Sequence, residues 1–223
     1  METKKVLENI KWLGHDCMMV NSVDAKYPVI YFDPYQLESA NLDKADIILI
    51  THEHYDHCSS DDVKKIMGQD TVIVTEKDSA KKLKKELGKL VDGKVEIIAP
   101  NQSINVKGVQ VSAVVSYNIN KKFHPKKNNW LGFVVDIGGV KIYHAGDTDF
   151  IPEMSQIDCD IAFLPVSGTY VMTAAEAASA ALEIKPKLAI PMHYGSLVGE
   201  LSDAELFKKA LDGKIEVHIC SKS

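Results

Sequence analysis

The sequence predicts an α/β protein in which two β-sheets pack face to face and helices lie on the outside. Strand-like apolar segments occur in both halves of the 223-residue chain, with helix-like segments between them. No linker or low-complexity segment divides the chain, so we expect one domain over residues 1–223. Apolar residues make up 45% of the chain and charged residues 26%, which is ordinary for a protein that buries a core.

Strands are predicted where β-branched, aromatic and leucine residues are concentrated. The run at 47–50, Ile-Ile-Leu-Ile, is apolar throughout, which is typical of a strand buried on both faces. Gly138-Gly139 between two such runs indicates a two-residue hairpin. The predicted strands span residues 6–13, 17–20, 28–32, 47–50, 71–75, 95–98, 109–115, 131–137, 140–144, 161–164, 188–191 and 215–219.

Helices are predicted from apolar spacing and from capping residues. In a capping box, an N-cap hydroxyl and an acid three residues later bond each other's backbone, and Thr173 with Glu176 fits this pattern. Ser202 with Glu205 stands in the same register. The predicted helices span residues 59–68, 78–87, 173–184 and 202–211.

Composition and charge exclude several classes of protein. The net charge of −5 gives no basic footprint, so we expect no nucleic-acid partner. No segment approaches about 18 consecutive apolar residues, so we expect no membrane span. Residues 1–6 are not followed by an apolar stretch of signal-peptide length, and the cysteines are scattered. We therefore expect a cytoplasmic protein with the free thiols Cys17, Cys58, Cys159 and Cys220.

Histidine and aspartate side chains are concentrated directly after the run at 47–50, where residues 51–57 read Thr-His-Glu-His-Tyr-Asp-His. Because side chains alternate along an extended chain, His52 and His54 point to the same side and can reach one ion. Asp56 and His57 follow as the chain turns and can serve a second ion. Imidazole with carboxylate suits Zn²⁺, Mn²⁺ or iron, so the sequence predicts a metal site at this strand end.

The pattern His52-x-His54-x-Asp56-His57 resembles the signature of the metallo-β-lactamase superfamily. This resemblance implies an αββα sandwich, with two mixed sheets flanked by helices and metals at one edge between the sheets. It also implies two divalent cations, with Zn²⁺ favoured and Mn²⁺ or Fe²⁺ as alternatives. Two later motifs also match the superfamily, Ala-Gly-Asp-Thr for its bridging aspartate and Pro-Met-His-Tyr-Gly for its late histidine, which implies metal ligation by Asp147 and His193.

The chain departs from the superfamily pattern in one place. The superfamily usually has another histidine for the first metal in a Gly-His-Thr-like turn, about one hairpin before the bridging aspartate. Here residues 118–125 read Asn-Ile-Asn-Lys-Lys-Phe-His-Pro, so His124 is the candidate ligand. If His124 is not a ligand, one ion would be held tightly and another weakly.

The turn at residues 12–16, Trp-Leu-Gly-His-Asp, resembles a turn in small metal-dependent hydrolases related to ascorbate-6-phosphate lactonase. In that branch the histidine lies near the site, so His15 is either an accessory ligand, a proton donor or a substrate contact, or else a packed turn residue. Asp33 resembles the family's Asp-Pro buttress, which bonds a ligand histidine and fixes its tautomer. His144 and His218 are expected to be packing residues.

The resemblance implies hydrolysis rather than electron transfer, because the electron-transfer branch has a glutamate at the position of His54. Cations that share Asp147 would also share a water, whose pKa falls from about 15.7 toward about 7. We therefore expect a metal-bound hydroxide that attacks a lactone or ester of a small-molecule metabolite. The expected catalytic residues are Asp56, Asp147 and His15.

Several alternatives stay open. Four lysines around His124 either hold a phosphate or carboxylate of an anionic substrate or simply form a solvated loop. A second hypothesis is a phosphodiesterase that acts on a nucleotide, a phospholipid or a nucleic-acid end. A third is a non-catalytic metal- or ligand-sensing protein with the same fold. The sequence leaves a homo-oligomer open. The lysines concerned are Lys121, Lys122, Lys126 and Lys127.

Overall fold

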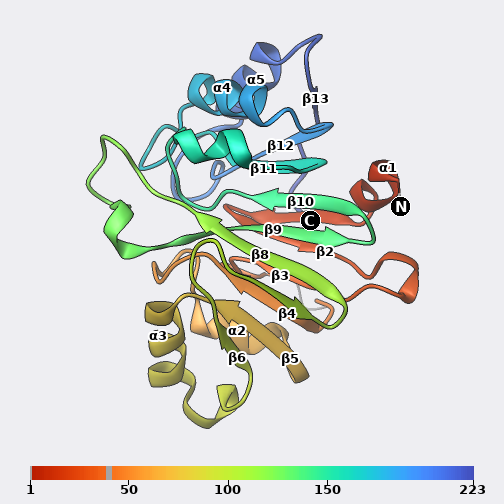
Figure 1. Ribbon diagram of the computed structural model, residues 1–223, viewed down its shortest axis with the longest axis vertical. Helices are drawn as coiled ribbons and strands as arrows, with labels where there is room; N and C mark the ends of the chain where they lie inside the picture. The colour runs from red at the N-terminus through yellow and green to blue at the C-terminus, as the bar shows by residue number, and fades with distance from the viewer. Residues whose placement is uncertain (1, 39–41) are drawn as a thin grey trace.

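Two mixed β-sheets face each other, and helices lie on their outer sides (Figure 1). The structure is a computed structural model that describes residues 2–38 and 42–223. In the six-stranded sheet, neighbouring strands follow chain order and β3 to β6 run parallel. It comprises β1 (Ile10–Gly14), β2 (Cys17–Val20), β3 (Ile30–Phe32), β4 (Ala45–Ile50), β5 (Met67–Thr75) and β6 (Val95–Ile97).

The second sheet has seven strands in the order β13-β12-β11-β10-β9-β8-β7. Strands β10 to β13 are parallel, whereas β7 to β10 are antiparallel neighbours. The predicted fold class, two mixed sheets flanked by helices, is confirmed. This sheet comprises β7 (Ser103–Val106), β8 (Val109–Val115), β9 (Leu131–Ile137), β10 (Val140–His144), β11 (Ile161–Pro165), β12 (Leu188–Met192) and β13 (Glu216–Val217).

Helices accompany both sheets. Figure 1 shows α2 and α3 beside β4 to β6 of the first sheet, and α4 and α5 beside β11 and β12 of the second. In the described part of the chain, no helix is long and apolar enough to span a membrane. The helices are α1 (Thr3–Leu7), α2 (Ser60–Ile66), α3 (Lys77–Leu87), α4 (Ala174–Ile184) and α5 (Leu201–Ala210), with short 3₁₀ turns at Val23–Ala25, Gly88–Val91, Lys126–Asn128 and Pro152–Gln156.

Alternate side chains of β4 enter two different cores, as expected for a strand buried on both faces. Ile47 and Leu49 join the inner core between the sheets, which also contains Phe133 of the second sheet. Ile48 and Ile50 join an outer core with residues of α2 and α3. The strand that precedes the histidine motif is therefore held on both sides.

The carboxyl ends of β4, β10 and β12 meet at one edge of the molecule, and backbone bonds join the two sheets there. The Leu131 N–H donates to the Thr51 carbonyl at 3.0 Å, and the His193 N–H donates to the His15 carbonyl at 3.2 Å. Gly146, after β10, has a φ of 63°, and a Cβ there would lie 2.8 Å from the Leu131 carbonyl oxygen. Only glycine fits this turn, which carries Asp147.

The first predicted element is wrong in part. Residues 6–13 were expected to form a strand, but α1 covers Thr3–Leu7 and β1 begins only at Ile10. The Asn9 side chain donates to the Lys5 carbonyl at 2.9 Å, which satisfies an acceptor at the helix end. The short strand β7 was not predicted.

The two predicted capping boxes have different outcomes. Thr173 and Glu176 form one at the start of α4, as expected. The box expected from Ser202 and Glu205 is wrong, because α5 begins at Leu201 and its capping box joins Glu200 with Asp203. In both segments an acid stands three residues after a capable N-cap, but the carboxylate of Glu200 takes the place of a hydroxyl. The Gly138-Gly139 hairpin joins β9 to β10, with positive φ at both glycines.

Candidate metal centre

The first group of converging side chains consists of His52, His54 and His124, called here the first cluster. One ring nitrogen from each lies within 4.8 Å of the others. His52 Nε2 and His54 Nδ1 are only 3.0 Å apart. Trp130 packs against both of these rings, with centroid distances of 4.6 and 4.7 Å. His124, on the loop between β8 and β9, therefore stands where the sequence placed it, beside the motif that follows β4.

Hydrogen bonds fix the tautomer of His52. The Thr51 hydroxyl donates to Asp33 Oδ2 at 2.7 Å, so its oxygen is left to accept a bond from His52 Nδ1, 3.0 Å away. The proton of the neutral ring is then on Nδ1, and Nε2 presents a lone pair to the first cluster. A chain of bonds from Asp33 thus prepares His52 to bind a cation.

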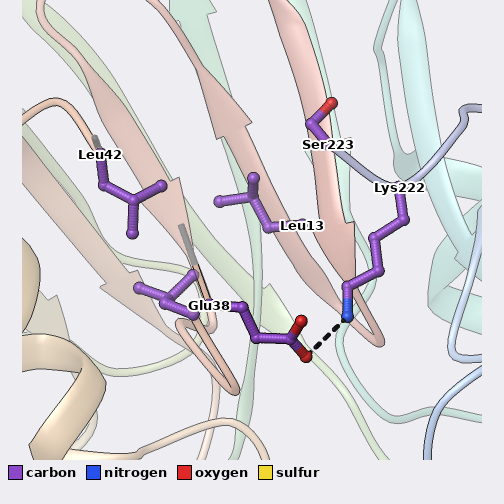
Figure 2. Close-up of a pocket in the computed structure, with 6 residues that line it drawn as sticks. Leu13, Glu38, Leu42, Lys222 and Ser223 are labelled. Carbon is purple, nitrogen blue, oxygen red and sulfur yellow. Dashed lines mark hydrogen bonds and ion pairs between the residues drawn. The ribbon is translucent and has the colours of Figure 1, made fainter. Parts of the chain in front are cut away.

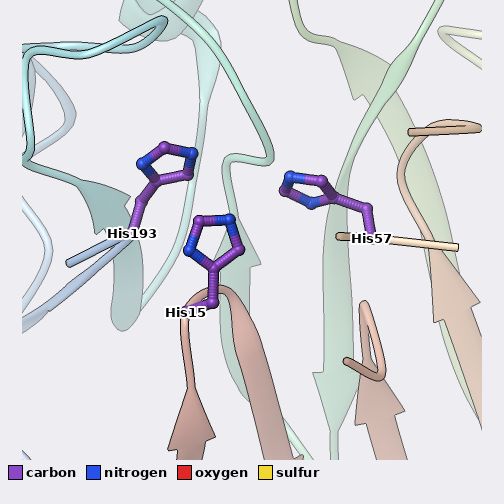
Figure 3. A group of neighbouring side chains, drawn as sticks. All are labelled: His15, His57 and His193. Carbon is purple, nitrogen blue, oxygen red and sulfur yellow. The ribbon is translucent and has the colours of Figure 1, made fainter. Parts of the chain in front are cut away.

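A second group, called here the second cluster, consists of His57, His193, Asp147 and Asp16. One ligand atom from each lies within 4.8 Å of the others, and all four side chains are buried. Asp147 Oδ1 lies 3.3 Å from His57 Nε2 and 3.4 Å from His193 Nε2. Figure 3 shows the rings of His57 and His193 close to that of His15. These residues come from four separate segments of the chain.

Asp147, a member of the second cluster, also faces the first. Its Oδ1 faces the second cluster, and its Oδ2 lies 3.1 Å from His124 Nε2 of the first. A carboxylate with one oxygen toward each group is the geometry that a bridging ligand requires.

Asp56 and His15 form a pair beside the second cluster. Asp56 Oδ2 lies 3.2 Å from His15 Nε2 and 3.7 Å from His57 Nε2. The centroids of the His15 and His193 rings are 4.3 Å apart. His15 is therefore close to the metal-type residues as well as being buried in its turn. Asp56 is nearer to His15 than to any of the converging nitrogens.

Asp33 and His144 are not members of either cluster but form hydrogen bonds that hold cluster residues and their turns in place. Asp33 Oδ2 accepts a bond from His57 Nδ1 at 2.8 Å, as the buttress interpretation expects. His144 accepts the Gly146 N–H at Nδ1 (3.2 Å) and donates from Nε2 to the Asp16 carbonyl (2.9 Å). His144 therefore fixes two turns of the site in addition to packing on Phe32. His218 is exposed and lies outside both clusters.

Comparison with known proteins agrees with this geometry. Residues 9–193 match the family model described as the beta-lactamase superfamily domain. The chain belongs to the beta-lactamase superfamily. Among its relatives, a UPF0173 metal-dependent hydrolase of Thermoplasma acidophilum is 34% identical, over 96% of this chain and 95% of the relative.

Two solved structures resemble almost the whole chain. The crystal structure of a candidate metal-dependent hydrolase from Parabacteroides distasonis is 35% identical, with a TM-score of 0.81 over 95% of this chain and 91% of that one. Igni18, a metallo hydrolase from Ignicoccus hospitalis, is 20% identical, with a TM-score of 0.73 over 96% and 95% of the two chains. The second likeness shows the fold alone. The superfamily expected from the sequence motifs is confirmed.

The electrostatics of this superfamily member favour the protonation states that cation binding needs. Burial, together with neighbouring histidines, lowers the pKa of His54 to about 4 and that of His52 well below its usual range. Burial opposes ionisation of Asp56, but the bond from His15 and the nearby His57 lower its pKa to about 2. Neutral imidazoles and ionised carboxylates are the forms that bind metals.

His57 behaves differently. Burial lowers its pKa, but the carboxylates of Asp147 and Asp33 outweigh this effect and raise it well above the usual range. Burial also opposes ionisation of Asp147, but His57 and His193 bring its pKa well below the usual range. Burial raises the pKa of Asp16. The second cluster therefore contains buried charges that interact strongly.

The residues present fit divalent cations. His57 Nε2, His124 Nε2 and Asp147 Oδ1 are buried, and none forms a hydrogen bond with a described residue. Buried polar atoms are normally paired or bound to a metal, because leaving them unpaired is costly. Imidazole and carboxylate donors suit Zn²⁺, Mn²⁺ or Fe²⁺.

Both clusters open into a cavity of about 430 Å³. Its floor contains His15, His54, Asp56, His124, Asp147 and His193, and its mouth contains Tyr55, Phe123, Tyr170, Leu197 and Val198. Another cavity, of about 270 Å³, lies beside Leu13, Glu38 and Lys222, and the Glu38 carboxylate pairs with Lys222 at 3.2 Å (Figure 2). It contains no group of metal-type side chains among the described residues, so we place the function at the first cavity.

The lysines near His124 do not serve the cavity. Lys121 pairs with Asp149, and Lys126 pairs with Glu153 at 2.7 Å. None of the described residues that line the cavity is a lysine. The structure therefore favours the solvated-loop interpretation over binding of an anionic substrate.

Asp16 is the site residue that the sequence analysis missed. It was noted only as part of the Gly-His-Asp turn, because a lone aspartate has no spacing that indicates ligation. The one available signal was its position directly after His15, in a turn already assigned to the site.

Proposed function

We propose that this metal-dependent hydrolase cleaves a lactone or ester of a small, uncharged metabolite. The observation that carries the proposal is the floor of the 430 Å³ cavity, where imidazoles and carboxylates converge and several buried nitrogen and oxygen atoms form no hydrogen bond with a described residue. The relatives named metal-dependent hydrolases support the reaction class.

We assign two cations to the two clusters, with Zn²⁺ as the first choice. The first cation would be held by the three imidazoles of the first cluster, and the second by His57, His193 and Asp147, with Asp56 nearby. Asp147 would serve both, since one of its oxygens faces each cluster. When bound, such cations act as Lewis acids that acidify a water and polarise a carbonyl oxygen.

The chain's own residues supply orientation and proton transfer. Asp33 and Thr51 hold the His57 and His52 rings so that each directs Nε2 to the centre. The ionised Asp56 accepts a hydrogen bond from His15 Nε2, which lies 3.2 Å away. This pair lines the cavity, and we assign Asp56 the transfer of the proton that the attacking water loses to the leaving oxygen, with His15 holding the carboxylate in place.

The mouth of the cavity indicates the kind of substrate. Tyr55, Phe123 and Tyr170 are 62%, 54% and 44% exposed, although such large side chains are usually covered. The Phe123 and Tyr170 rings contact each other edge to face, with centroids 4.5 Å apart. An apolar mouth above a polar floor suits an ester or lactone whose remaining part is apolar.

The proposal is tested with protein purified without chelator. Metal content is measured by mass spectrometry, and hydrolysis is measured on a panel of aliphatic and aromatic lactones and esters, with bis-p-nitrophenyl phosphate as the phosphodiester. We expect bound metal and turnover of apolar lactones or esters. Phe123→Ala should raise KM for these substrates and change kcat little, since it removes binding surface only.

Two results would contradict the proposal. Hydrolysis of the phosphodiester with no turnover of any lactone or ester would favour the phosphodiesterase hypothesis. Full metal occupancy without hydrolysis of any compound would favour a sensing protein.

A further inference from the structure

Asp16 belongs to the second cluster but to neither of the ligand sets assigned above. Its side chain is fully buried, at 0% exposure, in the tight turn between β1 and β2. The turn is fixed from both sheets. Trp12 Nε1 and the His193 N–H both donate to the His15 carbonyl, at 2.8 and 3.2 Å. His144 Nε2 donates to the Asp16 carbonyl at 2.9 Å. The position of the carboxylate is thus determined by a rigid backbone.

The Asp16 carboxylate has no conventional partner. Neither of its oxygens forms a hydrogen bond within residues 2–38 and 42–223. Among the described residues, the one basic nitrogen within ion-pair distance is His57 Nδ1, at 3.7 Å, and that nitrogen already donates to Asp33 at 2.8 Å. Burying a carboxylate without a hydrogen-bond or ion-pair partner raises the free energy of the folded protein. Proteins therefore normally pair such a group or use it to coordinate a metal.

The groups around Asp16 are those of a cation site. One oxygen each from Asp16 and Asp147, and one nitrogen each from His57 and His193, lie within 4.8 Å of one another. His57 Nε2 and Asp147 Oδ1 also lack a hydrogen bond. Two buried carboxylates repel each other unless a positive charge lies between them. A divalent cation satisfies both carboxylates and both imidazoles.

We propose that Asp16 is a direct ligand of the second cation, beside His57, His193 and Asp147. This inference rests on the proposed function, because it takes the second cation from there. It gives the second position two carboxylates and the nearby Asp56, whereas the first position has three imidazoles and the shared Asp147. Carboxylates suit harder cations such as Mn²⁺, and imidazoles suit Zn²⁺. The two positions therefore differ in cation preference.

The variant Asp16→Asn tests this assignment. Asparagine has the same shape without the charge, and its amide can still donate to Asp147, as a protonated Asp16 would. Parent and variant are loaded with excess Zn²⁺ or Mn²⁺, dialysed, and analysed by mass spectrometry and by calorimetric titration. We expect two cations per chain in the parent and one in the variant, with the second Kd raised by at least about 100-fold.

Asp160→Asn is the matched control. Asp160 immediately precedes β11, at the end of that strand remote from the clusters, and its carboxylate bonds the Lys141 N–H at 2.9 Å and pairs with Lys187 at 2.7 Å. This variant also loses an aspartate charge and should keep both cations.

Thermal unfolding gives a second readout that does not depend on activity. In chelator, Asp16→Asn should melt no lower than the parent, because asparagine has the same shape and replaces a buried carboxyl group that accepts no hydrogen bond. On addition of Zn²⁺ or Mn²⁺, the melting temperature should rise less in the variant than in the parent. A lower melting temperature in chelator would make Asp16 a structural residue and overturn the proposal.

Crystals of the metal-loaded parent provide a test without any variant. Anomalous scattering should place the second cation about 2.1 Å from an Asp16 oxygen. A cation bound by His57 and His193 but more than about 3 Å from Asp16, or an Asp16→Asn protein that keeps both cations at unchanged affinity, would overturn this inference alone. A parent that binds no cation would overturn the proposed function as well.

Discussion

The two clusters differ in how the chain builds them and in the charge they carry. The first takes His52 and His54 from one short segment and adds one loop residue, and its members are imidazoles. The second draws His57, His193, Asp147 and Asp16 from four segments that meet only in the folded protein. A local ligand set forms with its strand, whereas a dispersed, acidic set depends on the whole fold and on a cation to offset its repulsion.

The largest expected effect comes from Asp147→Ala, since this carboxylate is the one that faces both clusters. Loss of a shared ligand should weaken both cation sites by more than about 100-fold and abolish turnover. Mass spectrometry of the purified variant and the ester and lactone panel check this outcome. Asp160→Ala serves as the control. Full turnover by Asp147→Ala would mean that the reaction does not use the centre described here.

The next largest effect is the loss of one cation from one cluster at a time, which a matched pair of variants should produce. His54→Ala should empty the first position and leave the second filled, and His57→Ala should do the reverse. With Zn²⁺ and Mn²⁺ supplied together, the cation retained by His54→Ala should be enriched in Mn²⁺ relative to the one retained by His57→Ala. The metal ratio after dialysis is the measurement, and the exposed His218→Ala is the control. The same ratio in both variants would remove the distinction between the clusters.

The first cluster was easier to predict than the second, because two of its residues are neighbours in the sequence whereas those of the second are dispersed. His52, His54 and His57 stand together after a run of apolar residues, so alternation along the strand was enough to predict a site. Asp147 and His193 were found only because short motifs around them resemble those of a family. Asp16 lies in a turn whose resemblance pointed to His15 alone, and side-chain hydrogen bonds to the carbonyls of that turn hold it beside the other ligands.

Elsewhere in the chain, predictions failed where local signals were ambiguous or where the deciding partner is distant in sequence. The apolar residues Val6 and Leu7 suit a strand as well as one turn of helix, and α1 was missed for that reason. Lys121 and Lys126 looked available to a substrate, but their carboxylate partners lie more than twenty residues further along the chain.

A smaller effect is expected from Asp33→Asn, because Asp33 orients one histidine ring in each cluster. Asp33 bonds His57 directly and His52 through Thr51, so both rings lose part of their orientation. Cation affinity should fall by about 10- to 100-fold at the second position and by less at the first, where one more bond intervenes. Calorimetric titration of each cation measures both changes. Equal losses at the two positions would show that Thr51 transmits the support without attenuation.

The smallest expected difference appears on acidification. His54 has its pKa lowered to about 4, so it stays neutral and able to bind a cation until the pH approaches that value. The pKa of His57 is raised by Asp147 and Asp33 against the effect of burial, so protons compete for it at higher pH. As the pH is lowered from 8, the second cluster should therefore release its cation first, and the first cluster should follow at lower pH. Metal content after dialysis at a series of pH values follows both steps, with His57→Ala showing only the later one. Release of the first cation before the second would reverse the electrostatic distinction drawn here between the imidazole cluster and the acidic one.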